Sequence, residues 1–573
     1  MTTTPPQFDY IIVGGGTAGL AVASHLSKDE TVRVLVIEAG ADHSGDPLVS
    51  MPGGLVGQFG NPEYDWNFRT VPQEHLNGRL IPHPRGCGLG GCSSINFMMW
   101  LHPSRASLDA WAKLGNPGWG YDDLAPYPHD FSSNGNGPVQ VSFSEGYTEP
   151  FNQAWMETFA NLGHKLTADP RTGKAIGAFQ SPASIDPKDH TRSSATTAYL
   201  GPKVRQRSSL AVMTDATVKR ILFERDDTSG SLVAKGVVVD LQSKDGGVEE
   251  TTIPVNFEVI LSAGALQSPQ ILELSGIGQK DLLASHGIEV LVDNSGVGER
   301  LQDHAISTQC YEVRDDVPSG DTARDPAVLG QLMELYRTTN GDGPLGQSNI
   351  ATAYMPMVGG DGALVSPSEK KALLDTHLLG TGEGGGRIPS APLLHRAARR
   401  ADGPVPPPLN YATVLTCLNH PASRGSVHIV SPDIRDKPTV DPRYMSHPLD
   451  LEVMARHVQF VEKIVAAEPL RSSLKPQGAR IPPDLVAGSV ENAKEIVRRR
   501  LISIMHPTGS CAMLPREKGG VVDHELRVYG TRNVRVVDAS VFPLQPLGNT
   551  QSVVYAVAER AANMIKNGRL VVI

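Results

Sequence analysis

The stretch Tyr10-Ile-Ile-Val-Gly-Gly-Gly-Thr-Ala-Gly19 decides the fold of this chain. Apolar, β-prone residues run into a turn that is mostly glycine, and residues 20–26 continue with helical composition. A second apolar run, Val32 to Ile37, follows and ends at Glu38. A buried strand, a crossover helix and a second buried strand together predict a parallel sheet with both faces covered.

The glycines of this turn have the spacing of a dinucleotide-binding loop. Gly14, Gly16 and Gly19 form the pattern Gly-x-Gly-x-x-Gly, and Glu38 stands 19 residues beyond the last of them. Residues without a Cβ atom let a pyrophosphate approach the N–H groups of a helix N-terminus, and the carboxylate can accept hydrogen bonds from a ribose. Strand, spacing and carboxylate therefore predict a dinucleotide site rather than an ordinary glycine turn, with NAD and FAD both open.

Composition and charge exclude several classes of partner. The 573 residues are 40% apolar and 20% charged, which is typical of a folded chain with about four domain-sized units or two large ones. The net charge of −9 and the lack of a Lys/Arg-rich run argue against nucleic acid as a partner. No apolar stretch approaches the roughly 18 residues that span a bilayer, so no membrane association is expected.

The N-terminus and the cysteines favour a cytoplasmic protein. Residues 1–7 have no basic or apolar signal region, and the sequence contains no Asn-x-Ser/Thr glycosylation site. The five cysteines are few and odd in number, which indicates reduced thiols rather than a disulfide framework. Cys87 and Cys92 have no second pair nearby, so no metal site is predicted.

Further motifs lie along the chain. Segment 85–96 has four glycines in six positions, which indicates either backbone packed against a flat or charged ligand or a flexible loop. A helix is predicted over Ser268–Ser275, with Pro269 in its first turn, and another from Leu451. Glycine and proline clusters predict long surface loops over roughly 310–410. The other polar or glycine-containing motifs are Gly264–Gly278, His506–Met513, Val537–Ser540 and Gly548–Gln551.

In this order, the motifs resemble those of the glucose–methanol–choline (GMC) family of FAD-dependent oxidoreductases. The resemblance runs from the first strand to the C-terminal helix and is weakest across 310–410. It also includes Tyr64-Asp-Trp66, Arg192-Ser-Ser194 with Ala198-Tyr-Leu200, Ser275-Gly-Ile-Gly278, Gln302-Asp-His304 and Ser423-Arg-Gly425.

The resemblance implies an α/β fold with two domains. A Rossmann-like FAD-binding domain is expected over 1–145, 190–305 and 500–573. An α+β substrate-binding cap domain, built on an antiparallel sheet, is expected over 146–189 and 306–499.

The resemblance also implies roles for single residues. Glu38 is expected to bind the adenosine ribose, the glycines of the 14–19 turn the pyrophosphate, and Val218 the adenine through its backbone. FAD is expected to be non-covalent, because Ile95 stands where related flavoproteins carry a linking histidine. The other expected cofactor contacts are Thr17, Ala18, Gly90, Ser94, Asn96, Ala263, Asp538, Ala539, Asn549, Thr550 and Gln551.

His506 matches the catalytic base of the family, and Asn549 falls where members carry a second histidine or an asparagine. Alcohol oxidation requires removal of the hydroxyl proton while hydride leaves the carbon, and a neutral histidine is suited to take that proton. A polar neighbour can hold the alcohol oxygen, and a helix predicted over 550–565 directs its positive end at the reduced flavin. Without the family pattern, His506 is interpreted as a core histidine and Asn549 as a turn residue or N-cap. Asp303-His304 is interpreted as a structural pair.

The sequence thus predicts an enzyme that oxidises an alcohol to an aldehyde or ketone by hydride transfer to FAD. The expected substrate is a small or medium primary alcohol, aryl or allylic, and O2 or another electron acceptor reoxidises the flavin. Two alternatives stay open: a FAD-dependent lyase or decarboxylase on the same fold with no net flavin reduction, and a NAD-dependent dehydrogenase. The oligomeric state is left open.

Overall fold

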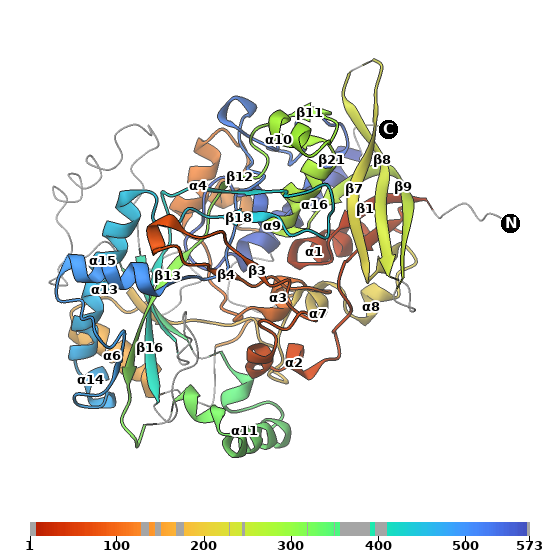
Figure 1. The fold of residues 1–573 in the computed structure, drawn as a ribbon. Coiled ribbons are helices and arrows are strands. Elements are labelled where there is room, and N and C mark those ends of the chain that lie inside the picture. Colours follow the sequence, from red (N-terminus) through yellow and green to blue (C-terminus); the bar gives the residue numbers. More distant parts are fainter. Residues whose placement is uncertain are drawn as a thin grey trace.

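Two large β-sheets occupy opposite sides of the molecule in the computed structural model (Figure 1). The predicted α/β fold with an antiparallel second sheet is confirmed. The domain boundaries drawn from the sequence stay predictions. The structure describes residues 7–127, 137–143, 150–167, 177–228, 230–242, 247–317, 319–348, 350–355, 390–395 and 410–569.

The first sheet is centred on the strand that precedes the glycine turn. Its order is β6-β2-β1-β9-β8-β7, with β21 beside β9. Helix α1 (Thr17–Leu26) follows the turn as predicted and packs against the C-terminal helix α16 (Gln551–Arg569). Five strands pair in parallel, and β7 and β8 continue from β9 as an antiparallel meander. The strands are β1 (Phe8–Val13), β2 (Val34–Ile37), β6 (Leu210–Met213), β7 (Ala216–Arg225), β8 (Leu232–Gln242), β9 (Val248–Leu261) and β21 (Val534–Val536).

The second sheet is antiparallel throughout its described pairs. Its order is β19-β13-β16-β15-β14-β5, with β20 beside β13. Helices α6 (Pro150–Asn161), α13 (Pro448–Ala466) and α15 (Val490–Arg500) cover one of its faces (Figure 1). The strands are β5 (Gly177–Gln180), β13 (Ala305–Glu312), β14 (Ala351–Tyr354), β15 (Ser390–His395), β16 (Tyr411–Leu418), β19 (Arg480–Ile481) and β20 (Leu501–Ser503).

The two faces of β13 and β16 have different neighbours. Successive side chains of a strand point to opposite faces. Tyr311 and Val414 lie in a hydrophobic core shared with α6 and α13. Ile306, Thr308 and Leu415 instead line a pocket that also touches the first sheet. The central strands therefore contribute to a core on one face and to a pocket wall on the other.

Helix α9 starts four residues earlier than predicted. It spans Gly264–Leu274, so Pro269 lies in its second turn instead of its first. Proline lacks the N–H that would bind the carbonyl four residues back, which here belongs to Ala265. The hydroxyl of Ser510 donates to that carbonyl at 2.6 Å. A side chain from a distant segment thus replaces the missing helical hydrogen bond.

The region 310–410 holds more regular structure than predicted. Helix α11 spans Pro326–Thr338 and is capped by the Asp325 side chain, which accepts from the Ala327 N–H. Strands β14 and β15 also fall in this region. The loop prediction is wrong for these three segments. The two strands are stabilised by pairing with distant strands, so the local sequence pattern does not reveal them. The clusters within 356–389 and 396–409 lie outside the described residues.

Short elements complete the fold. One of them is a three-stranded sheet, β12-β17-β18, that packs beside α9. No described helix is both long and apolar enough to cross a membrane. The short elements are β3 (Phe68–Arg69), β4 (Pro82–His83), β10 (Ile277–Gly278), β11 (Val292–Asp293), β12 (Glu299–Leu301), β17 (Gly425–His428), β18 (Thr439–Asp441), α2 (Pro47–Ser50), α3 (Cys92–Ile95), α4 (Arg105–Lys113), α5 (Tyr121–Leu124), α7 (Ala195–Tyr199), α8 (Pro202–Arg205), α10 (Lys280–Ser285) and α14 (Leu470–Ser473).

Candidate active site

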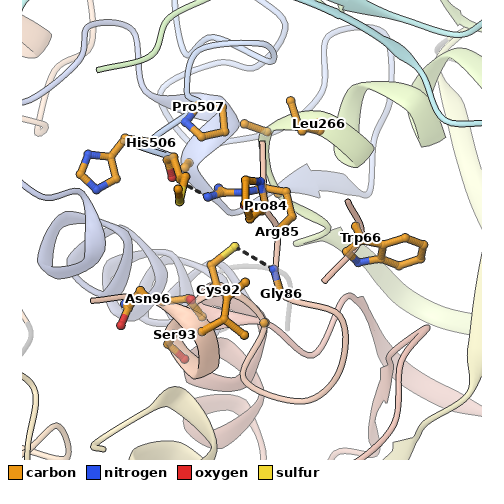
Figure 2. Close-up of a pocket in the computed structure, with 18 of the residues that line it drawn as sticks. Trp66, Pro84, Arg85, Gly86, Cys92, Ser93, Asn96, Leu266, His506 and Pro507 are labelled. Atoms are coloured by element: carbon orange, nitrogen blue, oxygen red, sulfur yellow. Dashed lines mark hydrogen bonds between the residues drawn. The ribbon is translucent and has the colours of Figure 1, made fainter. Parts of the chain in front are cut away.

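A pocket between the two sheets brings most of the sequence-predicted site residues together. Figure 2 shows His506 and Pro507 on one wall and Ser93 and Asn96 on the opposite wall, with Arg85 between them in this view. The predicted residues that line the pocket are Gly14, Gly16, Thr17, Ala18, Glu38, Asn96, Val218, Ala263, His506, Asp538, Ala539, Asn549, Thr550 and Gln551.

Three further predicted cofactor residues lie behind the pocket wall. Gly19 packs so tightly that a Cβ atom there would lie 1.9 Å from the carbonyl oxygen of Gly14. Gly90 has a φ of +88°, and its N–H donates to the carbonyl of Gly15 at 2.8 Å. The hydroxyl of Ser94 donates to a backbone carbonyl of its own loop. These residues support the backbone of the site, and the sequence pattern does not separate supporting residues from lining ones.

The N-terminus of α1 forms an open cradle with the second glycine cluster. Gly16 is the N-cap of α1 and offers no side chain to the first N–H groups of the helix. Gly91 crosses it with a φ of +49°, and a Cβ on Gly91 would lie 2.8 Å from the Gly16 Cα. Uncapped N–H groups at a helix N-terminus attract anionic groups. The cradle therefore fits a pyrophosphate.

Glu38 is held by backbone N–H groups where β2 ends. Its Oε2 accepts from Gly15 at 2.8 Å, and its Oε1 accepts from Gly40 at 3.0 Å and from Gly88 at 3.1 Å. Burial raises the pKa of Glu38, and these N–H donors oppose the rise. A carboxylate has lone pairs for further donors. Glu38 therefore fits contact with ribose hydroxyls.

Asn96 is oriented by a buried arginine. Nη1 of Arg192 donates to the side-chain oxygen of Asn96 at 2.9 Å and to its backbone oxygen at 2.7 Å. The Asn96 amide in turn donates to Gln551 Oε1 at 2.8 Å. Burial lowers the pKa of Arg192 to about 9. These hydrogen bonds join the loop after α3 to the first turn of α16.

Asp538 joins the end of β21 to the start of α9. Its Oδ2 accepts from the Gly264 N–H at 2.9 Å and from the Ser268 hydroxyl at 2.6 Å, and its Oδ1 accepts from the Ser540 N–H at 2.7 Å. Burial raises the pKa of Asp538. Gly264 has a φ of +83° with open space where a Cβ would stand, so a ligand can approach the backbone here.

His506 and Asn549 meet beside the second sheet. Nδ2 of Asn549 lies 3.4 Å from Nε2 of His506. Gly548 precedes Asn549 with a φ of +82°, and a Cβ there would lie 2.5 Å from the Tyr354 hydroxyl oxygen. Only glycine fits the turn that presents Asn549. The structure thus places the predicted pair side by side, although 43 residues separate them in the chain.

A buried carboxylate fixes the backbone of His506. Oδ1 of Asp303 accepts from the His506 N–H at 2.8 Å, and Oδ2 accepts from the hydroxyls of Ser503 and Tyr444. Burial raises the pKa of Asp303 to about 6. These contacts fit the structural interpretation of Asp303. Its neighbour His304, however, contacts the ring of His506, which sequence reasoning missed.

The surroundings of His506 keep its ring neutral. Burial, and then the nearby His304 and Arg85, lower the pKa of His506 well below its ordinary value. A neutral imidazole has one nitrogen that can accept a proton. Arg85 also lines the pocket and donates to the Met505 carbonyl. Arg85 begins the glycine-rich segment 85–96, and this position is the sequence signal that could have identified it as a pocket residue.

The described residues include no group of three His, Cys, Asp or Glu arranged to hold a metal ion. All five cysteines are free thiols.

Sequence models of one family match most of this chain. The N-terminal model of the GMC oxidoreductases matches residues 8–306, and the C-terminal model matches residues 421–558. The chain belongs to the GMC oxidoreductase family. The predicted resemblance is therefore confirmed, and so is FAD as the cofactor. This GMC oxidoreductase is a FAD-dependent oxidoreductase.

Similar proteins differ in what they act on. The dehydrogenase mpl7 of Monascus purpureus is 33% identical, with 98% of this chain and 96% of that protein covered. A variant of the formate oxidase of Aspergillus oryzae has a TM-score of 0.87 at 28% identity, with 99% of each chain covered. A fungal aryl-alcohol oxidase has a TM-score of 0.80 at 25% identity, with 98% of this chain and 99% of that chain covered. The family therefore sets the cofactor and leaves the substrate open.

The pocket residues of this GMC oxidoreductase fit FAD. The cradle at α1 offers N–H groups to the pyrophosphate, and Glu38 offers a carboxylate to the ribose. Ile95 is a buried apolar side chain of the pocket lining. It has no atom that can bond covalently to the flavin, which agrees with non-covalent FAD.

Proposed function

We propose that this GMC oxidoreductase oxidises an uncharged, mainly apolar primary alcohol to the aldehyde, with His506 as the base. The observation that carries the proposal is a neutral histidine whose Nε2 faces the Asn549 amide in a pocket with an apolar wall. Aryl and allylic alcohols fit this chemistry best, because they combine an apolar body with a reactive C–H bond next to the hydroxyl.

The wall from the second sheet supports the apolar substrate. Every described lining residue on this side is uncharged, and Phe97 and Met99 add apolar surface from the loop after α3. A cationic substrate placed against this wall would lose its hydration without gaining a counter-ion, because the charged side chain of the pocket lining that lies near His506 is the Arg85 cation. The lining residues from the second sheet and its neighbouring loops are Ile306, Thr308, Ile350, Thr413, Leu415, Ile502 and Ile504.

The proposed reaction assigns one step to each polar group. The Asn549 amide donates to the alcohol oxygen and holds it beside His506. The O–H bond breaks as its proton moves to Nε2, and the electron pair left on oxygen drives hydride from the carbon. Bound FAD supplies the acceptor for that hydride. Thr550 and Gln551, at the N-terminus of α16, line the pocket, so the positive end of this helix lies at the pocket.

The test is anaerobic mixing of the FAD-loaded enzyme with single alcohols, followed by visible flavin absorbance. Benzyl and cinnamyl alcohols should bleach the flavin faster than 1-hexanol, and choline should be slowest because it is charged. His506→Ala should lower the rate constant for flavin reduction by roughly 10²- to 10⁴-fold, the range for general-base catalysis. Asn549→Ala should lower it less, because asparagine orients the alcohol and takes no proton.

His457→Ala is the matched control, because His457 is a buried histidine of α13 outside the pocket. A loss well under tenfold in His506→Ala rejects His506 as the base. Turnover of a substrate with no bleaching by any alcohol rejects the oxidation and favours the lyase alternative. Peroxide release compared with dye reduction then assigns the electron acceptor.

A further inference from the structure

A second histidine contacts the proposed base directly. The rings of His304 and His506 meet edge to face, with centroids 5.1 Å apart, planes at 73° and Nδ1 atoms 2.9 Å apart. His304 stands just before β13 and is only 1% exposed. Its other ring nitrogen, Nε2, lies 2.8 Å from the backbone carbonyl oxygen of Asn419, just after β16. The His304 ring thus connects the second sheet to the base.

The partners of the two rings favour one arrangement of their protons. A carbonyl oxygen only accepts, so Nε2 of His304 must carry the N–H that faces Asn419. A neutral ring has one N–H, so Nδ1 of His304 bears a lone pair. The Pro546 carbonyl raises the pKa of this ring, but burial outweighs that effect and the ring stays neutral. Nδ1 of His506 must therefore donate to Nδ1 of His304. The Nε2 atom of His506 is left bare, facing the Asn549 amide donor at 3.4 Å.

The charges around the two rings agree with one N–H on each. Burial, and then the adjacent His420, lower the pKa of His304 to about 3. The pKa of His506 is lowered by burial, His304 and the Arg85 cation. The carboxylate in contact, Asp303, accepts from the backbone N–H of His506 and not from its ring. His304 is thus the acceptor that determines the tautomer of His506.

We infer that His304 is a positioning residue for the reaction: it holds the proton of His506 on Nδ1, so that the lone pair of Nε2 faces the substrate. The inference rests on the proposed function. When Nε2 takes the hydroxyl proton, a new N–H bond forms there and the Nδ1–H bond is kept. The hydrogen bond to His304 then becomes charge-assisted, which stabilises the imidazolium.

The test compares two substitutions of nearly equal shape. His304→Asn places an amide oxygen where Nδ1 stood, so the acceptor for His506 is kept. His304→Leu has the same branched skeleton without an acceptor. Both leave a similar space behind, so a difference between them reports the hydrogen bond and not the packing. His457→Asn serves as the control for loss of a buried histidine elsewhere.

Two measurements are made on each FAD-loaded variant. The first is the rate constant for anaerobic flavin reduction, with the alcohol dissociation constant obtained from its concentration dependence. The second is the low-field proton NMR spectrum, in which a buried, hydrogen-bonded imidazole N–H resonates. In His304→Leu the flavin should be reduced roughly 10- to 100-fold more slowly, the scale found when a metal-ligating histidine loses the partner that orients it. The alcohol dissociation constant of this variant should stay unchanged, and His304→Asn should keep most of the rate.

The NMR signal gives an independent decision. A low-field resonance should be present in the unmodified enzyme and in His304→Asn, and absent from His304→Leu and from His506→Ala. Equal rates in the two His304 variants, or a resonance that persists in His304→Leu, overturn the inference. If the flavin of His506→Ala is reduced at the normal rate, His506 is not the base and the proposed function is rejected. Failure of the inference about His304 alone leaves His506→Ala slow, so the two outcomes can be told apart.

Discussion

The surroundings of His506, more than its residue type, suit it to accept a proton. It is one of 18 histidines in the chain, and an exposed histidine is half protonated near pH 6.5. At His506 the burial of the ring and the nearby Arg85 disfavour the charged form. Asp303 holds its backbone and Asn549 faces its Nε2. Position and protonation state are thus set by different neighbours.

We expect the acid limb of kcat/KM to lie below pH 6.5. A base with a lowered pKa stays unprotonated until the pH falls through that lowered value, so the rate is flat across neutral pH and drops only in more acidic solution. The measurement is kcat/KM for a bleaching alcohol in overlapping buffers. The residual rate of His506→Ala should lack this limb, and a limb at or above pH 6.5 in the unmodified enzyme contradicts the assignment.

Among helices and strands, local signals were sufficient where long-range contacts agree with them. The strand, glycine turn and helix at the N-terminus follow the sequence pattern, and α13 begins at Pro448, three residues before the predicted Leu451. The predicted start of α9 was wrong because Pro269 usually marks a first turn. Ser510, more than 200 residues away, supplies the hydrogen bond that the proline cannot make. No local pattern carries that information.

We expect Ser510→Ala to destabilise the protein by about 1–3 kcal/mol, because it leaves the buried Ala265 carbonyl without a donor. The readout is thermal unfolding of the FAD-loaded protein. Pro269→Ala restores a helical N–H that can bind this carbonyl, so Ser510→Ala should cost clearly less in that background. An equal cost in both backgrounds rejects the proposed compensation.

At the scale of the whole molecule, the hydrogen bonds of His428 connect helix α9 to the three-stranded sheet β12-β17-β18. Its Nδ1 lies 2.7 Å from Oε1 of the buried Glu273, and its Nε2 lies 3.1 Å from Oε1 of Glu299. Burial alone lowers the pKa of His428, but the hydrogen bonds and charges of the two glutamates outweigh it and raise the pKa to about 9. The folded protein therefore binds this proton more tightly than the unfolded chain does.

We expect the protein to become less stable at alkaline pH, because His428 loses the proton that it shares with Glu273 and Glu299. An unfolded histidine titrates near pH 6.5, so the contribution is complete below that pH and is lost as the pH rises through about 9. The loss is about 3 kcal/mol at most. The unfolding temperature should fall over this window, and the fall should be smaller in His428→Gln. The same pH dependence in both proteins contradicts this role of His428.

The sequence carried the dinucleotide cradle, because glycine spacing is a local signal, and it carried FAD, because the order of the motifs along the chain matches one family. It did not carry the arrangement of His304, Asn419 and His506. Each is unremarkable within its own segment, and they meet only when β13, β16 and the segment after β20 align. Which ring nitrogen bears a proton depends on a backbone carbonyl 115 residues away. Such information exists only in the assembled fold.

The alternation along β13 and β16 bears on how enzymes of this kind diversify. Ile306, Thr308 and Leu415 line the pocket, and Tyr311 and Val414 pack in the core with the helices. A mutation at one set leaves the other set in place. Substitutions at the pocket-lining positions can therefore change the shape of the pocket, while the alternate positions keep the core that joins the sheet to its helices.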